Sequence, residues 1–199
     1  MDKKQIAIKL SKLKKHNCKN AGLEQYQTDS ELAAEITWNS YIDGNIKNKT
    51  VADLGCGNGI IGNAALILRA KKVYFIDKDK NAVETCMENN SDYKNAEFIC
   101  DDVTKFSKRV DTVLMNPPFG VRERKADKTF LLKAFEIARE IYSIHKTGSE
   151  RFIETVASEN GFSVKSVIPK NFIIKKIYKF HKRDNYTVKV GIWHISKNI

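Results

Sequence analysis

From residue 50 onward, short apolar runs alternate with stretches of helical periodicity, and this alternation constrains the fold more than any other feature. The expected strands are TVADLG, KKVYFIDKD, AEFICDDV and VDTVLMNPP, and the expected helices between them are IIGNAALILRA and NAVETCMENN. The stretch KTFLLKAFEIAREIYSIH is predicted as a long helix that can run into a further strand. Strands that alternate with helices form βαβ units and a parallel sheet covered on both faces.

The two ends of the chain depart from this alternation. Residues 4–13 have the apolar spacing of a short helix, and Thr28, Asp29 and Ser30 can cap a helix that begins near Glu31. At the other end, FSVKSVIPKNFIIKKIYKFHKR and YTVKVGIWHIS are predicted as two strands joined by a charged turn. The expected architecture is therefore a doubly wound, mostly parallel seven-stranded α/β sheet with a C-terminal antiparallel strand pair.

No internal repeat or low-complexity linker interrupts the chain. We therefore expect one domain over residues 1–199, with an N-terminal helical segment at 1–45 that covers a ligand site and an α/β core at 50–199.

The basic charge of the chain is concentrated at its ends. Residues 1–20 carry seven basic and one acidic residue, and residues 165–199 carry nine and one, whereas the middle of the chain is slightly acidic. This asymmetry favours a polyanionic partner, such as a nucleic acid, over a scatter of solvated lysines. No apolar run could span a membrane, the first residues are too charged for a secretory leader, and the cysteines lack C-x-x-C spacing. We expect a cytoplasmic protein with reduced thiols and no metal site.

A glycine-rich turn, ADLGCGNG, follows the first expected strand. Gly55, Gly57 and Gly59 allow a tight turn and a close approach of the backbone to a ligand, although this spacing alone occurs in many folds. The turn lacks the G-K-[ST] ending of a phosphate-binding loop. Asp53, just before the first glycine, disfavours a diphosphate and favours a ligand that carries an ammonium or sulfonium charge.

Two further carboxylates follow the next two strands. Asp77 ends the second strand, where a carboxylate can accept both hydroxyl groups of a ribose, and Asp102 follows the third, where one could accept an exocyclic amine. Each aspartate alone could equally be a helix cap or a solvated turn. Three at the carboxyl ends of adjacent parallel strands, beside the glycine turn, favour a nucleoside site.

The stretch DTVLMNPPFG, residues 111–120, ends a buried strand abruptly. Two adjacent prolines cannot continue a strand or a helix, because each lacks an N–H group and has a fixed φ. They hold Asn116 and Phe119 at the tip of the strand. An ordinary strand-ending turn is the alternative, but the position after a ligand loop and a buried strand favours a functional motif.

The segments DLGCGNG, FIDKD, DDV and NPPFG together resemble the Rossmann-like S-adenosylmethionine-dependent methyltransferases, and NPPF marks the branch that methylates exocyclic or amide nitrogens. LEQYQT, DTVLMNPPFG, YSIHK and YKFHKR further resemble the small-subunit ribosomal RNA adenine-N6 methyltransferases, the methyltransferase-like family five. This resemblance covers about residues 22–195. The chain departs from the family pattern at Asn58, where a second cysteine is expected between the glycines.

The resemblance implies S-adenosylmethionine as cofactor and assigns roles to individual residues. It places Gln25 and Thr28 over the cofactor, Gly55, Asn58 and Ile60 beside its methionine part, Asp77 at its ribose, Asp102 at its adenine, and Asn116, Pro117, Pro118 and Phe119 in the catalytic motif. It also implies a small zinc-binding activator subunit that covers apolar surface near the sheet edge.

The catalytic motif suits an exocyclic amine. The side-chain oxygen of Asn116 and the carbonyl of Pro117 can each accept one N–H of the amine, which favours a tetrahedral nitrogen with its lone pair directed at the methyl group. The ring of Phe119 can stack on a flipped base.

Basic residues interleaved with aromatic residues in YKFHKRDNY suit stacking on unpaired bases and contacts to phosphates, although an exposed hairpin turn is the alternative. The candidate RNA contacts are Lys179, His181, Lys182 and Arg183. The stretch VRERKADK after the motif is equally compatible with an RNA-contacting loop and with a solvated loop.

The sequence leaves other acceptors open, because a protein glutamine amide, guanine N2 and DNA adenine all present the same –NH₂ group. A non-enzymatic scaffold would require a damaged motif, whereas every motif residue is present here.

Overall fold

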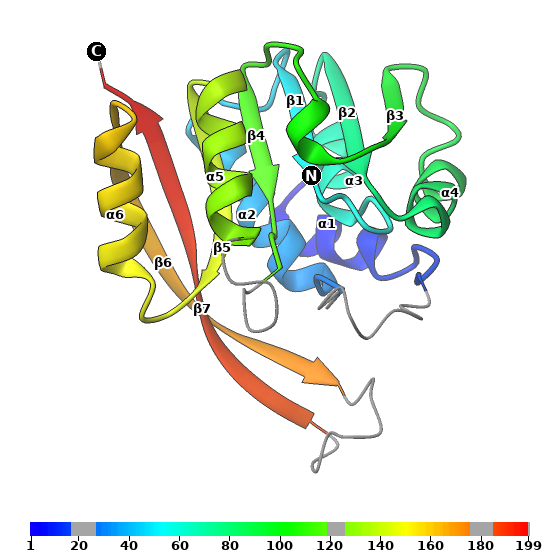
Figure 1. The fold of residues 1–199 in the computed structure, drawn as a ribbon. Coiled ribbons are helices and arrows are strands. Elements are labelled where there is room, and N and C mark those ends of the chain that lie inside the picture. The colour runs from blue at the N-terminus through cyan, green and yellow to red at the C-terminus, as the bar shows by residue number, and fades with distance from the viewer. Residues whose placement is uncertain (17–26, 119–125, 176–184, 199) are drawn as a thin grey trace.

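The computed structural model describes residues 1–16, 27–118, 126–175 and 185–198 and shows a central sheet with helices on both faces (Figure 1). The helices are α1 (Lys3–Leu10), α2 (Ser30–Ile42), α3 (Ile60–Ile67), α4 (Lys80–Asn89), α5 (Ala126–Ile137) and α6 (Glu150–Glu159), with a 3₁₀ turn at Val103–Lys105. The strands are β1 (Thr50–Leu54), β2 (Lys72–Asp77), β3 (Ala96–Cys100), β4 (Thr112–Met115), β5 (Glu140–Lys146), β6 (Phe162–Lys175) and β7 (Asn185–Lys197).

The seven strands lie in the order β3-β2-β1-β4-β5-β7-β6. The first five are parallel, whereas β7 runs antiparallel to both β5 and β6. The predicted doubly wound sheet with a C-terminal antiparallel pair is thus confirmed. The chain moves outward from β1 to β2 and β3 and then returns to place β4 on the other side of β1. In sheets of this kind the ligand crevice lies at the carboxyl ends of the strands at this reversal.

The stretch predicted as a long helix that can run into a strand contains both elements: α5 ends at Ile137, and β5 begins at Glu140. Helix α6 was not predicted, although its buried residues Ile153, Val156 and Ala157 have helical spacing.

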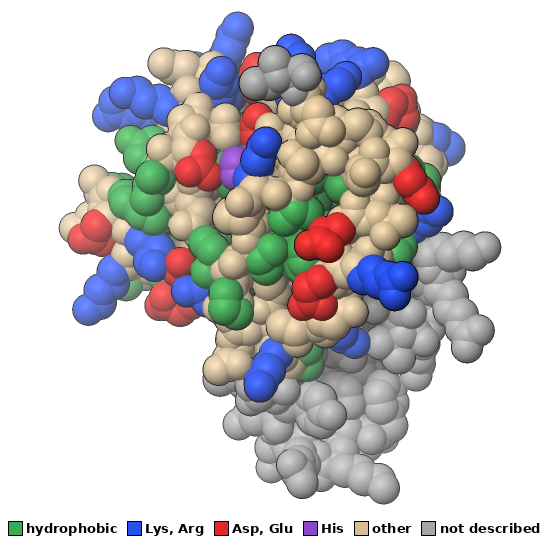
Figure 2. Space-filling view, turned by 90° about the vertical axis from the view of Figure 1, so that its left-hand side faces the viewer, with side chains coloured by type: hydrophobic (Ala, Val, Ile, Leu, Met, Phe, Trp, Pro, Cys, Tyr) green, Lys and Arg blue, Asp and Glu red, His purple; other side chains and the backbone are tan. Residues whose placement is uncertain are grey.

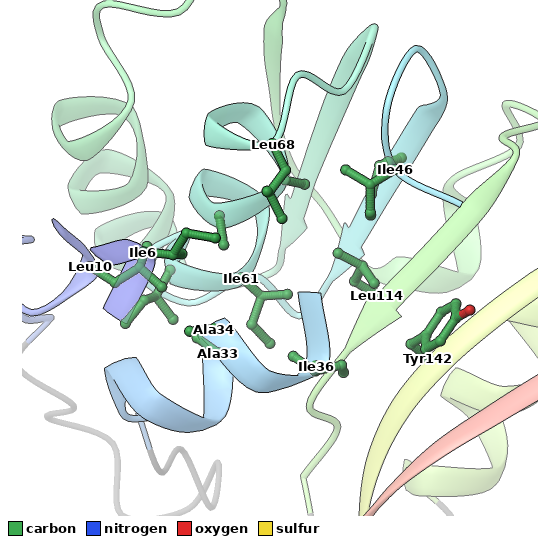
Figure 3. Close-up of a cluster of buried hydrophobic side chains, with 14 of the residues drawn as sticks. Ile6, Leu10, Ala33, Ala34, Ile36, Ile46, Ile61, Leu68, Leu114 and Tyr142 are labelled. Atoms are coloured by element: carbon green, nitrogen blue, oxygen red, sulfur yellow. The ribbon is translucent and has the colours of Figure 1, made fainter. Parts of the chain in front are cut away.

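Helices α1 and α2 are part of the hydrophobic core rather than an appendage. Figure 3 shows Ile61 of α3 between the side chains of α1, Ile6 and Leu10, and Leu114 of β4, with Ile36 of α2 nearby. All five side chains are buried. The opposite face of the sheet packs against α5 and α6 through a second buried cluster. The N-terminal segment is therefore fixed on the sheet by apolar burial.

The antiparallel pair extends beyond the rest of the sheet. Strand β5 ends at Lys146, opposite Val190, whereas the pairing of β6 with β7 continues as far as Lys175 opposite Asn185. We call this extension, residues 171–175 and 185–189, the C-terminal arm. Because β5 is parallel to β1–β4, the C-terminal arm projects past the carboxyl ends of the parallel strands (Figure 1).

The side of the molecule seen in Figure 2 carries hydrophobic side chains gathered between acidic ones near its middle, with basic side chains mostly toward the rim. Within the described ranges, no helix combines the length and the apolar character that crossing a membrane requires.

Candidate active site

Four polar side chains lie in a row at the carboxyl end of the sheet. Asp53 is in β1, Asp77 is the last residue of β2, Asp102 follows β3, and Asn116 directly follows β4. Because β3, β2, β1 and β4 are adjacent and parallel, the structure brings these residues to one edge. The sequence analysis selected all four, and their shared position fits one ligand crevice.

Asp77 holds the glycine turn against the end of β2. Its Oδ2 accepts a hydrogen bond from the backbone N–H of Gly57 at 2.9 Å, and its Oδ1 accepts one from the N–H of Asp79 at 3.0 Å. Burial raises the pKa of the Asp77 carboxyl, while these two hydrogen bonds act in the opposite direction. In the free protein the carboxylate therefore holds backbone groups, and its contact with a ribose stays a prediction.

Gly57 and Gly59 of the turn have different surroundings. Gly57 has φ +55°, and a Cβ built on it would meet no atom of the described residues within 4 Å. A Cβ on Gly59 would lie 2.4 Å from Sγ of Cys86. Gly59 is therefore required for the close packing of the turn on α4.

Asp53 is buried beneath the turn, with 1% of its surface exposed. Its Oδ2 accepts a hydrogen bond from the N–H of Gly62 at 2.8 Å. Burial raises the pKa of the Asp53 carboxyl to about 7, and the nearby charge of Asp77 adds to the increase. The side chain therefore changes charge near neutral pH in the protein without ligand.

We expect Asp53→Asn to stabilise the ligand-free protein at pH 8. Because the pKa is higher in the folded protein, the carboxyl makes its full contribution to stability below its pKa in the unfolded chain, about 3.8. This contribution is lost as the pH rises through about 7. The contribution to the free energy of unfolding is roughly 4 kcal/mol, which corresponds to a pKa increase of about three units. Asparagine keeps the acceptor for Gly62 and removes the charge. In thermal unfolding, the Tm of Asp53→Asn should exceed that of wild type at pH 8, and the difference should be smaller at pH 5. An equal difference in Tm at both pH values would contradict this account.

Asn116 presents an acceptor without a partner. Its Nδ2 donates a hydrogen bond to Oγ1 of Thr28 at 2.9 Å. Its Oδ1 is buried and accepts no hydrogen bond from any described residue. Buried polar atoms are nearly always paired, so an unpaired oxygen at the tip of β4 indicates a place for an N–H donor from a ligand. Pro117, which follows it, is buried.

Asp102, Asn58 and Ile60 have structural roles in the free protein. Asp102 caps the 3₁₀ turn, because its Oδ1 accepts hydrogen bonds from both the N–H and the hydroxyl of Thr104, and these hold its pKa below the usual value. Asn58 donates from Nδ2 to the carbonyl of Lys14 at 3.0 Å, and Ile60 is buried at the start of α3. Their roles as cofactor contacts stay predictions.

Several predicted residues lie outside the part of the chain that the structure describes. They are Gln25, Phe119, Lys179, His181, Lys182 and Arg183.

Sequence reasoning missed a strap that joins the N-terminal segment to the glycine turn. We define the N-terminal strap as residues 13–16 and 27–29. Asn89 of α4 accepts from the N–H of Lys14 at 2.8 Å and donates to the carbonyl of Lys14 at 3.0 Å, and Gln27 donates to the carbonyl of His16 at 2.6 Å. Residues 14 and 89 are far apart in sequence, so no local pattern predicts their pairing.

Residues 33–158 match the family model described as methyltransferase small domain. The chain is 34% identical to an uncharacterized protein of Methanocaldococcus jannaschii, over 98% of this chain and 94% of that protein. It is 35% identical to the rRNA N(6)-adenosine-methyltransferase Mettl5 of Drosophila melanogaster, over 86% of this chain and 85% of that protein.

Among solved structures, a protein of Pyrococcus horikoshii described as a candidate RNA methyltransferase superposes with a TM-score of 0.94 at 42% identity. The match covers 100% of this chain and 99% of that chain. The magnesium protoporphyrin IX methyltransferase of Synechocystis, solved with bound S-adenosylmethionine, has a TM-score of 0.62 at 18% identity, over 83% of this chain and 78% of that one. This second match is a likeness of fold.

Proposed function

The chain belongs to the methyltransferase small domain family, and we propose that it transfers the methyl group of S-adenosylmethionine to the exocyclic N6 of an adenine in small-subunit ribosomal RNA. The observation that carries the proposal is the buried, unpaired Oδ1 of Asn116 at the end of β4, beside the row of carboxylates. The relative from Drosophila melanogaster, named as an rRNA N(6)-adenosine-methyltransferase, supports an adenine in ribosomal RNA as the acceptor.

The crevice has groups that fit this cofactor. Asp77 would accept the ribose hydroxyls, Asp102 would accept the adenine amine, and Asp53 would favour the cationic end once ionised. The open space at Gly57 leaves room for a ligand against the backbone of the turn. When bound, S-adenosylmethionine supplies an electrophilic methyl group.

The chain's own residues prepare the acceptor nitrogen. The N6 amine of adenine is a weak nucleophile because its lone pair is delocalised into the ring. Asn116 Oδ1 and the carbonyl of Pro117 would each accept one N–H, so the nitrogen becomes tetrahedral and its lone pair is freed. These acceptors are fixed before the reaction, so they stabilise the positive charge that develops on nitrogen with little reorganisation. Both N–H hydrogens stay on nitrogen during the transfer, and the electrons of the broken C–S bond would stay on the sulfur of S-adenosylhomocysteine. The methylated nitrogen, then positively charged, releases one of its N–H protons to solvent, which leaves neutral N6-methyladenine.

The two basic ends of the chain support an RNA substrate. The C-terminal arm projects past the carboxyl ends of the parallel strands, and the N-terminal strap contacts the glycine turn at the same end. The two segments thus lie at the same end of the sheet although they are far apart in sequence (Figure 1). We place the RNA backbone along this end, with Lys179, Lys182 and Arg183 among its contacts.

We expect neutralisation of Lys179, Lys182 and Arg183 to weaken RNA binding and to flatten its dependence on salt. Each phosphate contact that is lost reduces the release of counterions, so the slope of log affinity against log salt should fall by about 1 per contact. RNA titrations at several salt concentrations, with wild type and triple variant, measure this slope. The affinity for S-adenosylmethionine is the control and should not change. Equal salt slopes for wild type and the triple variant would mean that the RNA binds elsewhere on the protein.

The proposed substrate is tested by labelled methyl transfer to purified ribosomal RNAs. Small-subunit RNA should accept the label and large-subunit RNA should not. Preferential labelling of large-subunit RNA, of DNA or of a protein would overturn the proposed substrate class.

We also propose that a small zinc-binding subunit partners the enzyme. Strand β3 is an edge strand, and its residues Phe98 and Ile99 are only half-buried, so apolar surface is available there. Size-exclusion chromatography with and without a candidate subunit, followed by activity measurement, tests this. A fully active monomer would contradict the partnership.

A further inference from the structure

We propose that Thr28 is a positioning residue that orients the catalytic amide of Asn116. The inference rests on the proposed function, because that function requires Oδ1 of Asn116 to face the acceptor amine. The resemblance assigns Thr28 only to the cofactor. In the structure its hydroxyl oxygen accepts a hydrogen bond from Nδ2 of Asn116 at 2.9 Å.

The orientation of an asparagine amide needs an external partner. Rotation about χ2 is soft and roughly two-fold, so Oδ1 and Nδ2 can exchange places unless a hydrogen bond distinguishes them. With Nδ2 directed at Thr28, Oδ1 points away from it, to a buried position where it accepts no hydrogen bond from a described residue. One hydrogen bond thus secures the donor end of the amide and leaves the acceptor end for the substrate.

Thr28 is itself held on both sides. Asp29, the next residue, caps α2 by accepting a hydrogen bond from the N–H of Leu32 at 2.7 Å. Gln27, the residue before, donates to the carbonyl of His16 at 2.6 Å. Helix α2 is anchored in the core through Leu32 and Ile36. The Thr28 hydroxyl therefore belongs to a segment with little freedom to follow Asn116 if the amide turned.

The strap that carries Thr28 also contacts the cofactor half of the site. The carbonyl of Lys14 accepts from Asn58 in the glycine turn, and His16 lies 3.3 Å from the carboxylate of Asp79, two residues after Asp77. Between them, the two stretches of the strap thus contact both the turn that would hold the cofactor and the amide that would hold the acceptor. The Thr28 hydroxyl can accept from Asn116 while its own O–H remains available to donate.

A positioning role and a cofactor contact predict different kinetics. If Thr28 orients Asn116, loss of its hydroxyl slows the transfer step even when every site is filled with cofactor. If Thr28 only binds the cofactor, loss of its hydroxyl raises the S-adenosylmethionine concentration that half-saturates the enzyme. The transfer rate then returns to the wild-type value at saturating S-adenosylmethionine.

The experiment compares Thr28→Val with Thr28→Ser in single-turnover methyl transfer at saturating S-adenosylmethionine and RNA. Valine has nearly the same shape but leaves the buried Nδ2 without a partner, so we expect the rate to fall by about tenfold. Serine keeps the hydroxyl and should stay within about twofold of wild type. Calorimetry should show S-adenosylmethionine affinities within about twofold for all three proteins.

Thr85→Val is a matched control, because the Thr85 hydroxyl donates to the carbonyl of Asn81 on the exposed side of α4. It makes the same chemical change away from the site and should leave the rate unchanged. The proposal is overturned if Thr28→Val transfers at the wild-type rate, if its rate recovers with more cofactor, or if Thr28→Ser is equally slow.

Failure of this inference is distinguishable from failure of the proposed function. If wild-type protein methylates a guanine or a glutamine amide, the proposed substrate is wrong, but the Thr28 comparison can be run on that acceptor. If wild type forms N6-methyladenosine and Thr28→Val does so equally fast, only the positioning role is wrong.

Discussion

Asn116→Ala is expected to lower kcat by about 100-fold or more, while S-adenosylmethionine affinity stays within about twofold of wild type. The reason is the position of Oδ1, which is buried at the end of β4 and accepts no hydrogen bond from the described residues. Its proposed partner is the acceptor amine, and the hydrogen bond strengthens as positive charge develops on nitrogen. The contribution therefore belongs to the transition state and not to cofactor binding.

Single-turnover transfer and calorimetry on the same preparations measure the two quantities. Asn160→Ala is a suitable control, because this asparagine donates to the carbonyl of Val156 at the end of α6 and is remote from the crevice. It should leave both quantities unchanged. Turnover by Asn116→Ala comparable to wild type would remove the basis of the proposed mechanism.

Asp77→Ala is expected to weaken S-adenosylmethionine binding by about 100-fold. Two hydrogen bonds from ribose hydroxyls to a carboxylate contribute about 3 kcal/mol together when each is charge-assisted. The variant also frees the N–H groups of Gly57 and Asp79, so the glycine turn loses its anchor on β2. Both effects lower affinity.

Isothermal titration measures the affinity, and thermal unfolding of the same variant shows whether the fold is retained. Asp111→Ala is a matched control: this carboxylate accepts hydrogen bonds from the N–H and the hydroxyl of Thr50 at 2.7 Å each, at the opposite end of the strands from the crevice. We expect it to bind S-adenosylmethionine as wild type does. Unchanged affinity in Asp77→Ala would show that the ribose lies elsewhere.

The order of strands and helices could be predicted because it depends on local patterns. Short apolar runs and helical spacing located β1 to β4, α3 and α4, and the carboxyl ends of parallel strands must share one edge. That rule predicted that Asp53, Asp77 and Asp102 lie at one edge, and the two prolines that end the fourth strand predicted that Asn116 lies at its tip. The boundary between α5 and β5 was harder to predict, because apolar residues recur from Phe130 to Ile144 and no glycine or proline separates the two elements.

The contacts that refine the site could not be predicted, because they join residues distant in sequence. The pairing of Asn89 with Lys14 and the hydrogen bond from Asn116 to Thr28 depend on how α1 and α2 pack on the sheet. Likewise, the role of Gly59 is visible only once Cys86 lies against it. The sequence predicts which residues bear chemistry, and the packing shows which of them, Asn58 and Asn116, contact the strap.

The most direct test of the central claim is the identity of the methylated nucleoside. Purified protein would be incubated with labelled S-adenosylmethionine and small-subunit ribosomal RNA, and the RNA digested and analysed by mass spectrometry. This account predicts N6-methyladenosine as the labelled product, absent when Asn116→Ala replaces wild type. Label in N2-methylguanosine, or in methylglutamine of a ribosomal protein when whole subunits are used, would contradict it.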